Sequence, residues 1–128
     1  MSHSNAIAQE PALRPASRSV NFVAWGLQVL LALTFLAAGG SKIAGAQPMV
    51  EVFDKIGIGQ WFRILAGVLE MAGAAALLIP RATFIGALLL GCVMIGAIVA
   101  HLTILGGAPA APAVLLALAA TVAYLRRP

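Results

Sequence analysis

The chain has 128 residues, of which 62% are hydrophobic and 9% are charged, and its formal net charge is +4. Soluble domains carry roughly 25% charged residues, and a chain this short exposes a large surface relative to its core. The composition therefore excludes a soluble globular domain, a disordered tail, a coiled coil and a nucleic-acid-binding module. It predicts a membrane protein of one domain.

Residues 1–19 are polar and contain two prolines and two arginines, so they are predicted to form a mobile N-terminal arm. An apolar run follows, and it predicts a first membrane span over residues 20–42. About 20 apolar residues are enough to cross roughly 30 Å of hydrocarbon. The run exceeds the roughly 7–15 apolar residues of a secretory signal peptide, which argues against that alternative.

The segment from Gln47 to Gln60 is more polar, with Pro48 suited to a first helical turn. Its apolar residues recur at the spacing of one helix face, at Met49, Val52, Phe53 and Ile56. This pattern predicts a short amphipathic helix lying on the membrane surface. An ordinary polar loop with one helical turn fits the segment equally well.

Three further apolar segments predict spans at about 61–79, 82–105 and 109–125. Pro80-Arg81 ends the first of them and Gly106-Gly107 ends the second. The two-residue connection predicts an antiparallel hairpin. The expected fold is all-α, a polytopic antiparallel bundle of four transmembrane helices formed by residues 20–128.

The basic residues predict the orientation of this bundle. An even number of spans places both termini on one side, with Arg14, Arg18, Arg81, Arg126 and Arg127. The opposite side carries Lys42, Lys55 and Arg63. Because cytoplasmic loops carry an excess of Lys and Arg, both termini are expected in the cytoplasm.

Glu70 lies about nine residues into the second span, near the expected membrane midplane. A charged residue there costs on the order of 2.5–3.5 kcal/mol of insertion free energy. Gly67 and Gly73 share its helix face, and small residues allow close helix packing. Glu70 is therefore expected to face other helices, where it is paired or protonated.

Four polar residues from three spans are expected to meet in a pocket in the outer half of the bundle: Lys42, Arg63, Glu70 and His101. Gln28 shares a helix face with Lys42 and completes this predicted polar pocket. Intramembrane ionisable groups are usually functional. The alternatives remain that these residues only lock the helices together, or that Lys42 and Arg63 extend to the outer headgroups.

The sequence contains no self-contained catalytic motif. Cys92 is the single cysteine, which excludes a dithiol enzyme working alone and a cysteine-based zinc site. No metal site is expected, and His101 is the one histidine within a span, which disfavours bis-histidine haem ligation. No nucleotide-binding glycine pattern occurs either.

The order of several short motifs resembles the DoxX family, specifically its DoxX-like branch, over roughly residues 22–126. These motifs are Gly39-Gly40-Ser41-Lys42, Phe53 to Arg63, Gly67 to Glu70, Ile79-Pro80-Arg81 and Gly96 to His101. The resemblance implies a small multi-pass protein of the bacterial inner membrane with four helices. It matches Lys42, Glu70 and His101 to recurring polar positions, without assigning them a catalytic role.

The family resemblance favours an accessory subunit of a quinone-linked redox complex, with redox-enzyme subunits as partners. A quinone contact is expected, although no cofactor is held by the chain alone. The alternative from a different class is a small proton-coupled transporter or channel acting as a homo-oligomer. A third hypothesis, an enzyme for a lipid-soluble substrate using Glu70 or His101, has no specific motif behind it.

Overall fold

The structure is a computed structural model that describes residues 17–128. Within this range the chain forms five α-helices and one π-helical turn, and no strand. The helices are α2 (Arg18–Ala44), α3 (Gln47–Ile56), α4 (Gln60–Leu77), α5 (Thr83–Ala100) and α6 (Ala110–Leu125), with the π-helical turn η1 (His101–Leu105) continuing α5. The predicted all-α class is confirmed.

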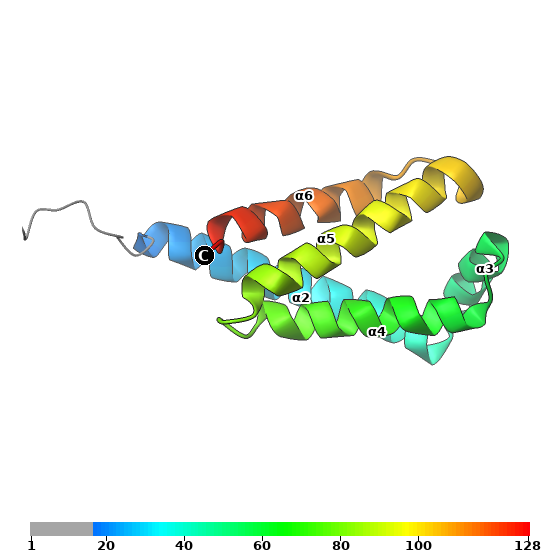
Figure 1. Ribbon diagram of the computed structural model, residues 1–128, viewed down its shortest axis with the longest axis horizontal. Coiled ribbons are helices and arrows are strands. Elements are labelled where there is room, and N and C mark those ends of the chain that lie inside the picture. Colours follow the sequence, from blue (N-terminus) through cyan, green and yellow to red (C-terminus); the bar gives the residue numbers. More distant parts are fainter. Residues whose placement is uncertain (1–16) are drawn as a thin grey trace, which may run out of the picture.

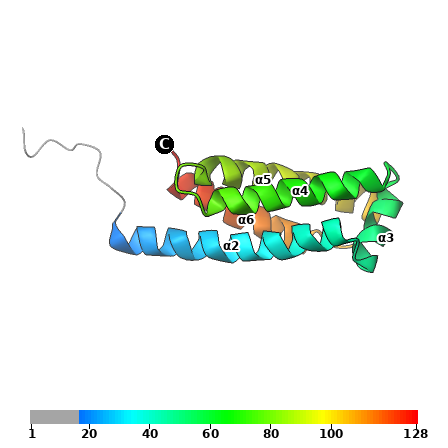
Figure 2. The same cartoon turned by 90° about the horizontal axis from the view of Figure 1, so that it is seen from below.

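The four longer helices contact one another in a closed ring: α2 contacts α4, α4 contacts α5, α5 contacts α6, and α6 contacts α2. Figure 1 shows α4 and α5 diverging from the turn that connects them, with α3 at the wide end of the wedge. Figure 2 shows α2 running along the length of the other helices. The shortest helix, α3, contacts α4, η1 and α2, so it covers the end of the bundle where α4 and α5 stand apart.

Local capping residues mark both ends of α2 and the C-terminal end of α3. Ser17 accepts a hydrogen bond from the amide of Val20 at 3.1 Å and starts α2 before the apolar run begins. Gly45 ends α2 with a φ of 75°, and Gly57 ends α3 with a φ of 80°, a conformation that glycine adopts without strain. For this reason α2 exceeds the predicted span at 20–42. Residues 1–16 of the predicted arm lie outside the described range, and Arg18 and Ser19 belong to α2.

Two glycines bring the backbones of α2 and α4 into contact. A Cβ atom on Gly39 would lie 2.8 Å from the carbonyl oxygen of Gly67, and one on Gly67 would lie 2.9 Å from that of Gly39. Real Cβ atoms do not approach this closely, so the crossing requires glycine on both helices. Lys42 and Glu70 each follow one of these glycines by three residues, on the same helix face.

The outer surface of the bundle is apolar as well as its interior. The core is formed by fully buried side chains that include Leu31, Phe35, Leu77, Leu90 and Val122. Large apolar side chains also point outward, among them Phe22, Leu33, Ile85, Leu102 and Val114. Two described helices are long and apolar enough to cross a membrane, namely α2 and the helix formed by α5 with η1. This surface suits contact with lipid rather than with water.

Candidate functional site

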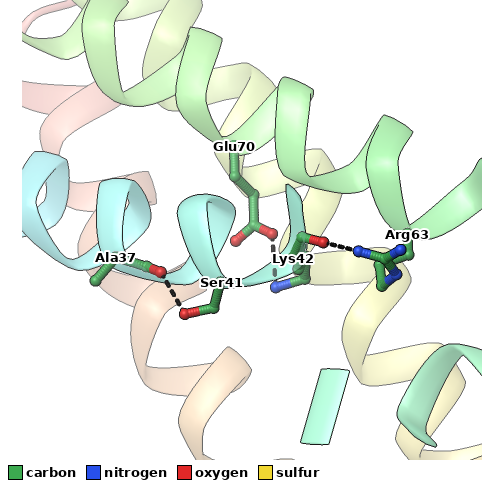
Figure 3. A network of polar contacts seen from close by, with 5 residues as sticks. All are labelled: Ala37, Ser41, Lys42, Arg63 and Glu70. Carbon is green, nitrogen blue, oxygen red and sulfur yellow. Dashed lines mark hydrogen bonds and ion pairs between the residues drawn. The ribbon is translucent and has the colours of Figure 1, made fainter. Parts of the chain in front are cut away.

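A buried ion pair joins α2 and α4. The Nζ atom of Lys42 lies 2.7 Å from Oε1 of Glu70 (Figure 3). The side chain of Glu70 is 1% exposed and that of Lys42 is 17% exposed. The close crossing at Gly39 and Gly67, one turn away on each helix, holds the two charged groups together. An unpaired carboxylate in an apolar environment costs free energy. Here its charge is balanced by the ammonium group of Lys42 on the neighbouring helix.

Arg63 lies beside this pair but contacts the backbone instead of the carboxylate. Its Nη1 donates a hydrogen bond to the carbonyl oxygen of Lys42 (Figure 3), and its Nε donates to Oε1 of Gln60 at 2.8 Å. The carbonyl of Lys42 belongs to the last turn of α2, where the helix dipole favours a cation. Arg63 therefore ties the end of α2 to α4.

A cavity of about 360 Å³ lies between α4 and α5. Its polar lining residues are Lys42, Glu70 and His101, and its other lining residues are apolar or glycine. Three of the five residues predicted for a polar pocket therefore share one cavity. Ligand pockets in proteins have this character, a mostly apolar wall with a few converging polar groups.

The apolar face of α3 forms one wall of the cavity. Met49, Val52, Phe53 and Ile56, the residues whose spacing predicted an amphipathic helix, all line it. Phe53 is 6% exposed, and its ring meets that of Phe62 edge to face at a centroid distance of 5.8 Å. The sequence suggested that this face rests on a membrane surface, whereas in the structure it covers a cavity of the protein itself.

His101 stands at the junction of α5 and the π-helical turn. Its Nδ1 lies 2.9 Å from the carbonyl oxygen of Ala97, and because a carbonyl accepts, Nδ1 is the donor. His101 also lines a more open groove of about 330 Å³ beside α3, and Val52 and Leu105 line both spaces. Single π-helical turns occur frequently at functional sites. His101 thus lies where the cavity and the outer groove meet.

Glu70 has unused hydrogen-bonding capacity. Among residues 17–128, no group donates a hydrogen bond of regular geometry to either carboxylate oxygen, and the ion-pair contact of Lys42 is made to Oε1. A buried polar atom without a partner costs about 1–3 kcal/mol, and more when it is charged. Such an atom in a native protein requires a physical explanation.

Gln28 lies elsewhere. It is fully buried, donates to the carbonyl of Leu77 at 2.8 Å, and accepts from Nε of Arg126 at 2.7 Å. It precedes Lys42 by fourteen residues, about 21 Å along the helix axis, and does not line the cavity. Gln28 and Lys42 share a face of α2, as expected. Their separation along the helix axis keeps Gln28 away from the other predicted residues. Sequence analysis missed its partner Arg126, which was expected to signal orientation alone.

Replacing Gln28 with leucine should destabilise the protein by about 1–3 kcal/mol, because Nε of Arg126 loses its acceptor in a partly buried environment. The carbonyl of Leu77 keeps a hydrogen bond from Thr83 at 3.1 Å. The measurement is the midpoint of thermal unfolding in detergent. Thr34→Val is the control, since Thr34 bonds within its own helix, to Leu30. If the unfolding midpoint of the Gln28→Leu variant fell no further than that of the control, this role for Gln28 would be contradicted.

Residues 17–128 contain no group of three or more His, Cys, Asp or Glu side chains arranged to hold a metal ion. The single cysteine, Cys92, is exposed on α5. The chemistry available in the cavity is therefore that of one carboxylate, one ammonium group and one imidazole. These groups can bind and orient a polar headgroup and exchange protons with it.

Comparison with known proteins identifies one family. The model of the DoxX-like family matches residues 26–122, from the first half of α2 to the last turn of α6. Searches of the curated proteins and of the solved structures gave no match. The match includes Lys42, Glu70 and His101 and covers most of the chain. With its two strongly apolar helices, the chain is a membrane protein that belongs to the DoxX-like family.

Proposed function

We propose that the protein is an integral membrane accessory subunit of a redox complex and that its cavity binds the headgroup of a quinone. The observation that carries this proposal is the apolar cavity between α4 and α5 with the Lys42–Glu70 ion pair in its wall. A quinone ring is flat and apolar with polar atoms at its edge, and it reaches a protein through the lipid. A cavity with few, convergent polar groups suits such a ligand.

The proposal places α4 and α6 across the membrane together with α2 and α5. The insertion cost of Glu70 is lowered because its carboxylate is turned inward and paired. The 16 residues of α6 extend for about 24 Å, close to the hydrocarbon thickness. With both termini in the cytoplasm of a bacterium, the cavity lies in the outer half of the inner membrane and α3 lies at the outer surface.

Electron transfer belongs to partner subunits in this proposal. The sequence has one cysteine and no nucleotide-binding glycine pattern, so a flavin, dithiol or metal centre would be supplied by another chain. The protein's own part is to hold the quinone headgroup and to exchange protons with it at Glu70 or His101.

Gly96→Leu should abolish quinone retention without unfolding the protein. Gly96 lines the cavity, and a Cβ atom there would meet nothing within 4 Å, so a leucine side chain has room at the cavity edge. Leucine also favours a helix by close to 1 kcal/mol relative to glycine. The measurement is the amount of quinone extracted from protein purified in mild detergent, quantified by mass spectrometry, together with the redox subunits that co-purify.

Gly26→Leu is the matched control. Gly26 is also a helical glycine with nothing within 4 Å of a Cβ atom, but it lies outside the cavity. This variant should retain as much quinone as the unchanged protein. If the unchanged protein retains no quinone and no redox enzyme accompanies it, the proposed function is wrong.

The ion pair also supports the second candidate, a proton-coupled transporter acting as a homo-oligomer. A buried carboxylate beside a lysine is an arrangement that transporters use for proton relay. In that case purified protein in liposomes would show pH-dependent uptake that Glu70→Gln abolishes. The quinone measurement and the uptake measurement give opposite results for the two candidates.

A further inference from the structure

The cavity contains a buried hydrogen-bond acceptor that no described residue satisfies. Glu70 is 1% exposed and lines the cavity, and within the described range its Oε2 has no hydrogen-bond partner. A carboxylate can only accept. A ligand that completes its hydrogen bonding must therefore bring a donor.

His101 supplies a second acceptor. Its Nδ1 proton is donated to the carbonyl of Ala97, and in the neutral ring this leaves Nε2 as a lone-pair acceptor. Among the described residues, the side-chain hydrogen bond that His101 makes is that of Nδ1. Lys42 is the donor among the polar lining residues, and one of its three N–H groups is directed at Oε1 of Glu70.

From this pattern we infer that the cavity selects headgroups that carry a hydroxyl donor, and so binds a hydroquinone or another phenol in preference to the oxidised quinone. This inference rests on the proposed function, since it specifies the ligand of the same cavity. An O–H group donated to a carboxylate makes a strong, charge-assisted hydrogen bond. A quinone carbonyl offers no proton and leaves Oε2 of Glu70 unpaired in an apolar wall.

The inference is tested with four ring compounds of similar size: a short-chain benzoquinone, the hydroquinone obtained by reducing it, a para-alkylphenol, and the methyl ether of that phenol. Binding to the purified full chain in detergent is measured by equilibrium dialysis. The hydroquinone should bind about tenfold to a hundredfold more tightly than the quinone, and the phenol should exceed its ether similarly. The phenol pair separates hydroxyl donation from any redox reaction.

The outcomes distinguish this inference from the function on which it rests. Equal binding of all four compounds, or tighter binding of the quinone and the ether, overturns the preference and leaves a quinone site in place. Binding of none of them overturns both. Glu70→Gln should reduce the preference, because its amide oxygen is a neutral acceptor. Where that variant does not accumulate, the phenol and ether comparison on the unchanged chain decides alone.

Discussion

Glu70→Gln is expected to destabilise the folded protein by about 3 kcal/mol, because the ammonium group of Lys42 would lose its counter-ion while three-quarters or more of its side chain stays buried. Lys42→Met should cost a similar amount, since it leaves the carboxylate of Glu70 charged and alone. The double variant Lys42→Met with Glu70→Gln should recover most of this loss. Replacing both members of a buried ion pair with neutral groups of similar size is often close to neutral.

The three variants form a double-mutant cycle with the unchanged protein. Thermal unfolding midpoints and membrane accumulation are measured for all four. Strong non-additivity shows that the two groups act as one unit across α2 and α4. Losses that simply add, each well under 1 kcal/mol, would show that the ion pair contributes nothing measurable to stability.

The same cycle separates a structural role of the pair from a binding role. A double variant that accumulates normally has kept the contact between α2 and α4 without the ion pair, so any loss of quinone binding by it reports on binding and not on folding. The proposed function adds that this folded variant binds no quinone, because both charged groups of the cavity wall are gone. If a stable double variant retained quinone normally, the charged pair would not be part of the quinone-binding site.

Much of the helical pattern was predictable because it depends on local sequence. Runs of apolar residues, Pro48 near a helix start and the glycines between segments placed each described helix within a few residues of its observed bounds. Glu70 was predicted to face another helix because small residues share its face, and the structure places it against α2. In both cases the decisive information lies within one or two turns of helix.

The cavity and the partner of Gln28 were not predictable, because they depend on how the helices cross. Helical periodicity does not determine that. The cavity exists because α4 and α5 diverge from their connection and α3 folds across the opening (Figure 1). A helix face shows which residues point the same way, but not at what height a neighbour meets them. Gln28 therefore shared a face with Lys42 and still paired with Arg126, which lies 98 residues later in the chain.

The second large effect is expected at the helix crossing, where Gly39→Leu should prevent the protein from accumulating. Even a Cβ atom on Gly39 would lie 2.8 Å from the backbone oxygen of Gly67 and 3.2 Å from Cβ of Glu70. Backbone atoms do not move aside as a flexible side chain does, so α2 and α4 would separate. Overpacking typically costs about 1–3 kcal/mol, and the separation also breaks the ion pair between Lys42 and Glu70.

Gly40→Leu is the matched control, one residue further along the same helix. A Cβ atom on Gly40 would meet nothing within 4 Å, so leucine there should be tolerated and should gain close to 1 kcal/mol of helix propensity. Accumulation and unfolding midpoints of the two variants are compared under one set of conditions. Similar behaviour of the two would mean that α2 and α4 do not cross at Gly39. The geometry that holds Glu70 against Lys42 would then have to be sought elsewhere.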